Sequence, residues 1–138
     1  MKIPLANLDL IDYLICKFNS SALIDSSNKM YFWGDYFDGF KIKQPELLYD
    51  FEDKLIDISF GFKHALVLLD NKSVLSWGDG TYGELGLGKA FMVPEPREIS
   101  FFRENEIQII KVEAGARHSI CLDNLGRLFG FGVNTFES

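Results

Sequence analysis

The chain has 138 residues, of which 47% are hydrophobic and 14% aromatic, and it carries a formal net charge of −6 at pH 7. This composition is typical of a globular protein and excludes an intrinsically disordered chain. The acidic balance disfavours broad binding to nucleic acid, because that affinity rests on lysine and arginine side chains that neutralise phosphates.

The first predicted elements lie between residues 10 and 54 and form the faintest of three similar units. Tyr13-x-Ile15 indicates a short alternating strand, and residues 18–25 and 28–33 supply two further apolar strands, the second ending in Trp33-Gly34. A fourth strand is expected over residues 46–49. Phe18 and Ser21 stand where we expect the loop glycine and histidine found in the two later units.

The second unit, between residues 55 and 108, repeats this pattern more clearly. Its strands are bounded by turn residues, and the run over residues 65–69 is apolar on both faces, which indicates a sheet packed between other sheets. A fourth strand is expected over residues 97–101. The landmarks, in chain order, are Ile56-x-Ile58, Gly61-x-x-His64, Asp70-Asn71, Trp77-Gly78 and Pro96-x-x-Ile99.

The third unit, between residues 109 and 138, is displaced from the second by a constant 54 residues, since 115 minus 61 and 131 minus 77 give the same number. Its landmarks are Ile110-x-Val112, Gly115-x-x-His118, Asp123-Asn124 and Phe131-Gly132. Such a fixed period identifies a repeat protein, whose structural unit is one repeat. This last unit is incomplete.

Four strands in about 50 residues are typical of a propeller blade. We therefore predict an all-β fold, a partial β-propeller of about three four-stranded blades, with approximate repeats at 10–54, 55–108 and 109–138. The aromatic residues that close each third strand are expected to pack between blades. The glycines are expected to permit positive φ or close backbone contact. These structural positions are Trp33, Gly34, Gly61, Trp77, Gly78, Gly83, Gly115, Phe131 and Gly132.

The segment over residues 77–88, with Gly61-x-x-His64 before it and Pro94 and Pro96 after it, resembles the repeat of the regulator of chromosome condensation family. The resemblance is strong over residues 55–132 and weak over residues 3–48. Glu84 replaces the usual glutamine, Gly80 the usual asparagine, and Glu137 a glycine. Family propellers close with about seven blades. The resemblance therefore implies that residues 1–138 are a fragment of a longer propeller, or that the chain self-associates.

His64 and His118 recur at one repeat position, which favours a structural hydrogen bond to a neighbouring loop over catalysis, because a catalytic residue is needed only once. Lys63 and Arg117 precede them, so all four residues are candidates for a partner-binding rim. An acidic protein partner would fit the two cations. The alternative is that both cations are simply solvated surface residues.

The resemblance also implies a second function, guanine-nucleotide exchange on a Ran-like small GTPase as part of a complete propeller. Exchange factors of the family contact the GTPase through acidic loop residues, whereas Lys63 and Arg117 reverse that charge. A third hypothesis is a nucleotide-binding enzyme, because Gly78-x-Gly80-x-x-Gly83 matches the dinucleotide fingerprint. That fingerprint requires a helix after its third glycine, and the glycine-rich residues 84–88 disfavour one.

The segment over residues 89–102 is longer than its counterpart in the first unit and carries Phe91 and Met92 near two prolines. Either this apolar loop contacts a partner, or it covers the edge of its blade. Cys16 and Cys121 lie in apolar strands and are expected to be buried free thiols.

Two cysteines without a C-x-x-C spacing, and two histidines, offer no zinc set. No apolar run has the length of a membrane span or a signal sequence. We therefore expect no metal, no cofactor, no small-molecule substrate, no membrane and no catalytic residue, and a reducing compartment, the cytoplasm or the nucleus. The leading prediction is a protein-interaction module that binds its partner through the loops of one rim.

Overall fold

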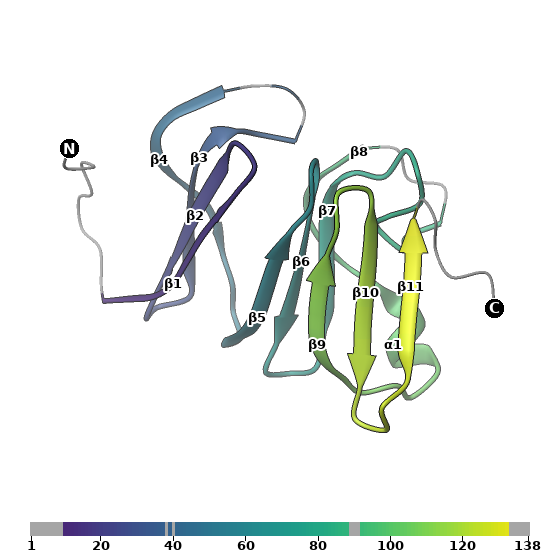
Figure 1. Ribbon diagram of the computed structural model, residues 1–138. Coiled ribbons are helices and arrows are strands. Elements are labelled where there is room, and N and C mark those ends of the chain that lie inside the picture. Colours follow the sequence, from purple (N-terminus) through teal and green to yellow (C-terminus); the bar gives the residue numbers. More distant parts are fainter. Residues whose placement is uncertain (1–9, 38, 40, 89–91, 133–138) are drawn as a thin grey trace.

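The computed structural model describes residues 10–37, 39, 41–88 and 92–132, and these form three antiparallel sheets that stand side by side (Figure 1). We call them the first, second and third blades. The strand order within each blade follows the chain. The bounds are β1 (Ile11–Lys17), β2 (Ser20–Asp25), β3 (Lys29–Asp35), β4 (Lys41–Asp50), β5 (Leu55–Phe60), β6 (His64–Leu69), β7 (Val74–Asp79), β8 (Met92–Glu98), β9 (Ile109–Ala114), β10 (His118–Asp123) and β11 (Leu128–Gly132).

The predicted all-β partial propeller is confirmed, with four strands in each of the first two blades and three described strands in the third. The prediction of a fourth strand over residues 97–101 was wrong. That strand, β8, comes earlier and contains both Pro94 and Pro96, which is tolerated because β8 is an edge strand. Residues 100–104 instead form the short helix α1 (Ser100–Glu104), whose Phe102 is buried.

The hydrophobic core lies between the blades and consists of two clusters. Alternation along β6 sends Ala65 and Val67 toward the first blade and Leu66 and Leu68 toward the third. The second blade is therefore buried on both faces, which explains why residues 65–69 lack a polar side chain. Phe102 of α1 joins the second cluster.

The aromatic residues that close the third strands occupy one register position. Trp33 pairs with Ser21, Trp77 with Ala65, and Phe131 with Ser119. Each position faces the preceding blade. Trp77 is fully buried in the first hydrophobic cluster. Phe131 is partly buried and packs against the second hydrophobic cluster. Trp33 is only half-buried, because no described strand precedes the first blade.

The glycine after each aromatic is required by backbone geometry. Gly34, Gly78 and Gly132 have φ values of 99°, 112° and 111°, in the left-handed region that side chains disfavour. A Cβ atom on any of them would also clash with a backbone carbonyl of the loop that joins the first two strands of the same blade. The aromatic–glycine pair therefore places an apolar ring between blades while its backbone passes close beside that loop.

The same strand register corrects the predicted alignment of the first unit with the two later units. Ser20 pairs with Gly34 as His64 pairs with Gly78 and His118 with Gly132. Ser20, not Ser21, therefore occupies the histidine position, and Lys17, not Phe18, occupies the loop glycine position. The one-residue slip matters because successive residues of a strand point to opposite faces.

Candidate interaction surface on the rim

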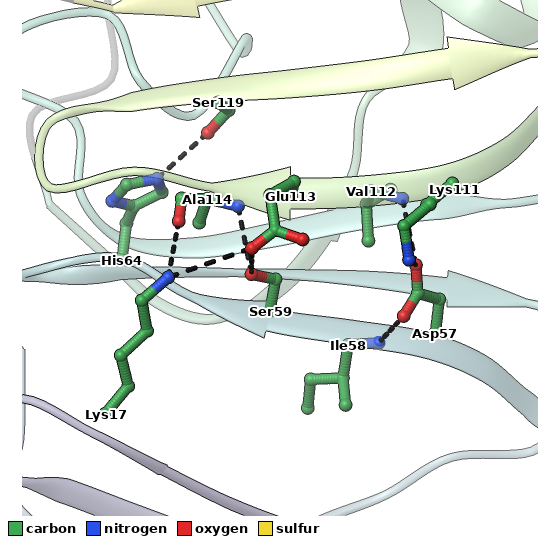
Figure 2. A network of polar contacts seen from close by, with 10 residues as sticks. All are labelled: Lys17, Asp57, Ile58, Ser59, His64, Lys111, Val112, Glu113, Ala114 and Ser119. Carbon is green, nitrogen blue, oxygen red and sulfur yellow. Dashed lines mark hydrogen bonds and ion pairs between the residues drawn. The ribbon is translucent and has the colours of Figure 1, made fainter.

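One end of all three blades carries the loops β1–β2, β5–β6 and β9–β10, together with the segments that follow β3 and β7. We call this end the rim. The loops are held in place because neighbouring blades are joined through side chains directly beneath them (Figure 2). The rim is therefore a surface built by several blades and not by one loop.

His64 joins the second blade to the third. Its Nε2 lies 2.9 Å from the Oγ of Ser119, and that hydroxyl donates to the carbonyl oxygen of Glu84 at 2.7 Å. Because the hydroxyl proton is used there, Nε2–H is the donor to Ser119. The ring is completely buried, and burial lowers the pKa of His64 from 6.5 to about 4, so it is neutral at physiological pH.

The glycine of Gly-x-x-His is explained by the ring that folds back over it. A Cβ atom on Gly61 would clash with the imidazole of His64 and with the carbonyl of Gly115, and one on Gly115 would clash with the imidazole of His118. Where the first blade has Ser20 instead of histidine, no ring needs that space. Lys17 occupies the corresponding position there.

The inner strands of the second and third blades are joined by side chains that bond to backbone groups (Figure 2). The Asp57 carboxylate accepts a hydrogen bond from the Val112 amide at 3.0 Å, and the Ser59 hydroxyl accepts one from the Ala114 amide at 2.9 Å. Lys17 reaches from the first blade and donates to the Ala114 carbonyl at 2.7 Å. Three blades therefore meet at one point below the rim.

Lys63 and Arg117 lie on the rim with exposed side chains, next to the two histidines. The ion pairs among the described residues use Lys17, Arg103, Lys111 and Arg127, and include neither Lys63 nor Arg117. The guanidinium of Arg117 instead lies over the ring of Tyr82, 5.1 Å from its centroid. Both cations are therefore available to a negatively charged group.

Two pockets flank Lys63 at equivalent places between blades. The first–second pocket has a volume of about 330 Å³ and lies between the first and second blades, and the second–third pocket, of about 260 Å³, lies between the second and third. Lys63 and Phe62 line both. The first–second pocket also contains Lys41 and the carboxylate of Asp35. The second–third pocket contains Arg117 and Tyr82 and the carboxylates of Asp79 and Glu84.

An aromatic pair stands between these pockets. The rings of Phe18 and Phe62 lie 5.3 Å apart, and the two residues are 51% and 50% exposed. They come from equivalent loops of the first and second blades. An exposed apolar pair flanked by unpaired cations is a suitable anchor for a protein segment.

The remaining candidate residues differ in their exposure and in their position on the blades. His64 is buried and cannot touch a partner without unfolding, whereas His118 is half-buried on the far side of the third blade. Met92 is 42% exposed at the start of β8, where it pairs with Asp79 of the second–third pocket without lining that pocket itself, and Phe91 lies outside the described residues. Cys121 is buried as predicted, but Cys16 is exposed, because it faces away from the second blade.

Nothing in the described part of the chain supports a nucleotide or metal site. After Gly83 the chain makes tight turns, with the Gly83 amide bonded to the Gly80 carbonyl and the Gly86 amide to the Gly83 carbonyl, and no helix follows. The fingerprint therefore lacks the helix N-terminus that would hold a pyrophosphate. The described residues contain no cluster of metal-ligating side chains, and no helix among them is long and apolar enough to cross a membrane.

Sequence reasoning missed Lys17, Lys41 and Phe18 as parts of the rim. The first unit has lost its Gly-x-x-His motif, so only the strand register identifies Phe18 and Asn19 as the equivalents of Phe62 and Lys63. Glu84 is 3% exposed, and burial raises the pKa of its carboxyl group. No sequence pattern indicates that the turn containing Glu84 lies between two blades.

Comparison with known proteins places these blades in a family. Two models of the regulator of chromosome condensation (RCC1) repeat match the chain, one over residues 72–122 and one over residues 55–84 and 109–137. The chain is 31% identical to the human probable E3 ubiquitin-protein ligase HERC6, over 91% of this chain and 13% of that protein. It is 33% identical to the Xenopus laevis protein RCC2 homolog, over 81% of this chain and 23% of that protein.

Among solved structures, Prp20p from Saccharomyces cerevisiae superposes with a TM-score of 0.77 at 22% identity, covering 96% of this chain and 37% of that one. This likeness concerns the fold alone. The chain spans less than a quarter of the length of the two relatives named above. With the matched repeats, the Trp-Gly and Gly-x-x-His positions and the blade architecture in agreement, the chain belongs to the RCC1 repeat family.

Proposed function

We propose that this chain is a protein-interaction module whose rim binds an acidic segment of a partner protein. The observation that carries the proposal is the unpaired state of Lys63 and Arg117 on a chain with a net charge of −6. Lys41 lies in the first–second pocket and also takes part in none of the described ion pairs. Three cations therefore lie at the end of the blades where two pockets open, outside the described ion pairs, although carboxylates also line both pockets.

The partner segment should contain both carboxylates and an apolar side chain. An exposed ion pair stabilises a complex by at most about 1 kcal/mol, so charge alone gives little affinity. The exposed rings of Phe18 and Phe62 supply the apolar contact that interface anchors require. Because Lys63 lines both pockets, a bound segment would lie across the blades from one pocket to the other.

A charge-reversal experiment tests this function. K63E/R117E should weaken binding of a labelled peptide rich in glutamate and phenylalanine by tenfold or more, about 1.4 kcal/mol. K54E/K72E makes the same change in net charge at the opposite end of the blades and should bind as the wild type does. Binding should also weaken with added salt. Equal affinities of the two variants, or no measurable binding by the wild type, would contradict the proposal.

Regulation of a small GTPase is the second candidate. It is favoured by the similarity to Prp20p, which is described with binding properties to Gsp1p and histones. Exchange would proceed by displacement, with a bound loop disfavouring the nucleotide-bound state and no covalent chemistry. Lys63 and Arg117 carry the charge opposite to the acidic contacts expected of an exchange factor. Release of labelled GDP from Ran-like GTPases, with and without the chain embedded in a complete propeller, measures this activity.

No residue of the chain is assigned a catalytic role. The ligase activity named for HERC6 belongs to a protein of which this chain spans 13%. The burial of His64 and its hydrogen bond to Ser119 support a structural role for this histidine.

A further inference from the structure

The two rim pockets differ in the carboxylates that line them. Among its described lining residues the first–second pocket has one carboxylate, that of Asp35, whereas the second–third pocket has two, those of Asp79 and Glu84. The cations Lys63 and Arg117 line the second–third pocket as well. An acidic segment could neutralise these two cations, but it offers no positive charge to the two carboxylates beside them.

The charged groups of the second–third pocket differ in exposure. Lys63 and Arg117 are exposed to solvent. Asp79 is half-buried, and Glu84 is only 3% exposed. None of the ion pairs among the described residues includes either carboxylate. A buried carboxylate without a counter-ion is costly, and burial accordingly raises the pKa of Glu84. The buried side of this pocket therefore favours a cation.

Both carboxylates are held in place by the turn that follows β7. The Oε1 atom of Glu84 accepts a hydrogen bond from the Tyr82 amide at 2.8 Å, and the Oδ1 atom of Asp79 accepts one from the Thr81 amide at 2.9 Å. The backbone carbonyl of Glu84 is anchored in turn by the Ser119 hydroxyl at 2.7 Å. One oxygen of each carboxylate is thus oriented by the backbone, and no described side chain donates to the other oxygen.

The size and the chemistry of the second–third pocket fit one arginine side chain. Pockets that hold drug-sized ligands have roughly 300–1,000 Å³. This pocket has about 260 Å³, so a single side chain is the better match. A guanidinium has five N–H donors in one plane, is more weakly hydrated than an ammonium and stacks on aromatic rings. The exposed ring of Phe62 also lines the pocket and offers such a surface.

We propose that the second–third pocket binds an arginine side chain of the partner segment, with its guanidinium on the carboxylates of Glu84 and Asp79. Carboxylates that flank this arginine in the segment bind Lys63 and Arg117, so that every charged group of the pocket is paired in the complex. The inference rests on the proposed function, because it names one residue of the same partner segment. Glu84 replaces the usual glutamine of the repeat, so the extra negative charge distinguishes this chain.

Two labelled peptides rich in glutamate and phenylalanine test the proposal, one with a central arginine and one with citrulline, which has nearly the same shape and no charge. The wild type should bind the arginine peptide about tenfold more tightly, the effect of one hydrogen bond to a charged group. E84Q keeps an oxygen that can accept from the Tyr82 amide and should bind both peptides equally. D35N makes the same change of charge in the first–second pocket and should keep the preference. A preference that survives in E84Q would overturn the proposal.

The same experiment separates failure of this inference from failure of the proposed function. If the wild type binds both peptides equally and K63E/R117E weakens both, the rim binds an acidic segment but the arginine subsite is refuted. If the wild type binds neither peptide, the proposed function and this inference fail together.

A second measurement requires no peptide. N-acetyl-arginine amide at millimolar concentration should shift the backbone amide NMR signals of Tyr82 and Glu84 in the wild type, and its citrulline analogue should not. E84Q should show neither shift, and its thermal unfolding should show no loss of stability, because glutamine removes a buried charge and keeps an acceptor oxygen. A wild type whose signals do not respond to the arginine compound would overturn the proposal even if the acidic peptides bind.

Discussion

The Nε2 atom of His64 lies 2.9 Å from the Oγ of Ser119, and this contact joins two blades whose sheets share no backbone ladder. The Ser119 hydroxyl in turn donates a hydrogen bond to the carbonyl oxygen of Glu84, in the turn beneath the rim. His64 therefore holds the rim loops of the second and third blades in register. The stability of the blades and the shape of the rim depend on the same side chain.

The chain should lose stability in mild acid because of His64. The unfolded chain binds the imidazole proton near pH 6.5 and the folded chain only near pH 4, so the unfolded state holds more protons between these values. The contribution of the neutral ring is therefore complete above pH 6.5 and is lost as pH falls toward 4, by about 3 kcal/mol in all. Urea unfolding across this range measures the free energy. H64Q keeps an N–H donor and should flatten the dependence, whereas H118Q should leave the contribution of His64 in place.

Glycine 115 is predicted to be required by the histidine ring above it. G115A should lower the free energy of unfolding by about 1–3 kcal/mol, because the new Cβ atom would meet the imidazole of His118. Removing the ring in G115A/H118A should recover most of that loss. The matched pair at the second blade should differ: G61A/H64A should recover less, since the carbonyl of Gly115 still obstructs Gly61. Equal recovery in both pairs would show that the Gly115 carbonyl is not an obstacle, and no recovery in G115A/H118A would show that the ring is not one.

These positions show how much of the fold the sequence predicts. The aromatic–glycine and Gly-x-x-His landmarks recur because each blade meets the same steric demands, so the repeat and the all-β architecture could be derived from spacing. β8 was misplaced because its prolines suggest a turn, although they are tolerated at an edge strand. The exposure of Cys16 and the half-burial of Trp33 were missed for one reason. Their burial depends on a neighbouring blade, and local pattern carries no information about it.

The Asp57 carboxylate is predicted to stabilise the contact between the second and third blades through the Val112 amide, and only slightly through Lys111. D57A should cost about 1–2 kcal/mol, because the Val112 amide at 3.0 Å loses its acceptor. D57N retains an acceptor oxygen and should cost less. K111A removes only an exposed ion pair at 3.9 Å and should change the free energy of unfolding by less than about 1 kcal/mol. A K111A variant as unstable as D57A would assign the contact to charge instead.

The two thiols should differ in reactivity. Cys16 is exposed, whereas Cys121 is buried, and burial raises the pKa of Cys121 to about 12. Since the thiolate is the reactive form, a thiol reagent at pH 8 should modify Cys16 quickly and Cys121 only when the blades open. Mass spectrometry of the native and the urea-unfolded chain measures both rates. Rapid modification of Cys121 in the native C16S variant would show that the second core cluster is not closed.

The rim is the central claim, and photo-crosslinking tests it most directly. A photoreactive phenylalanine at position 62, beside Lys63, should form adducts with an acidic partner segment, and adding K63E/R117E to the same chain should abolish them. The same group at position 72, at the opposite end of the blades, should form none. Adducts of equal yield from both positions, or adducts from position 62 that survive the charge reversal, would contradict the account.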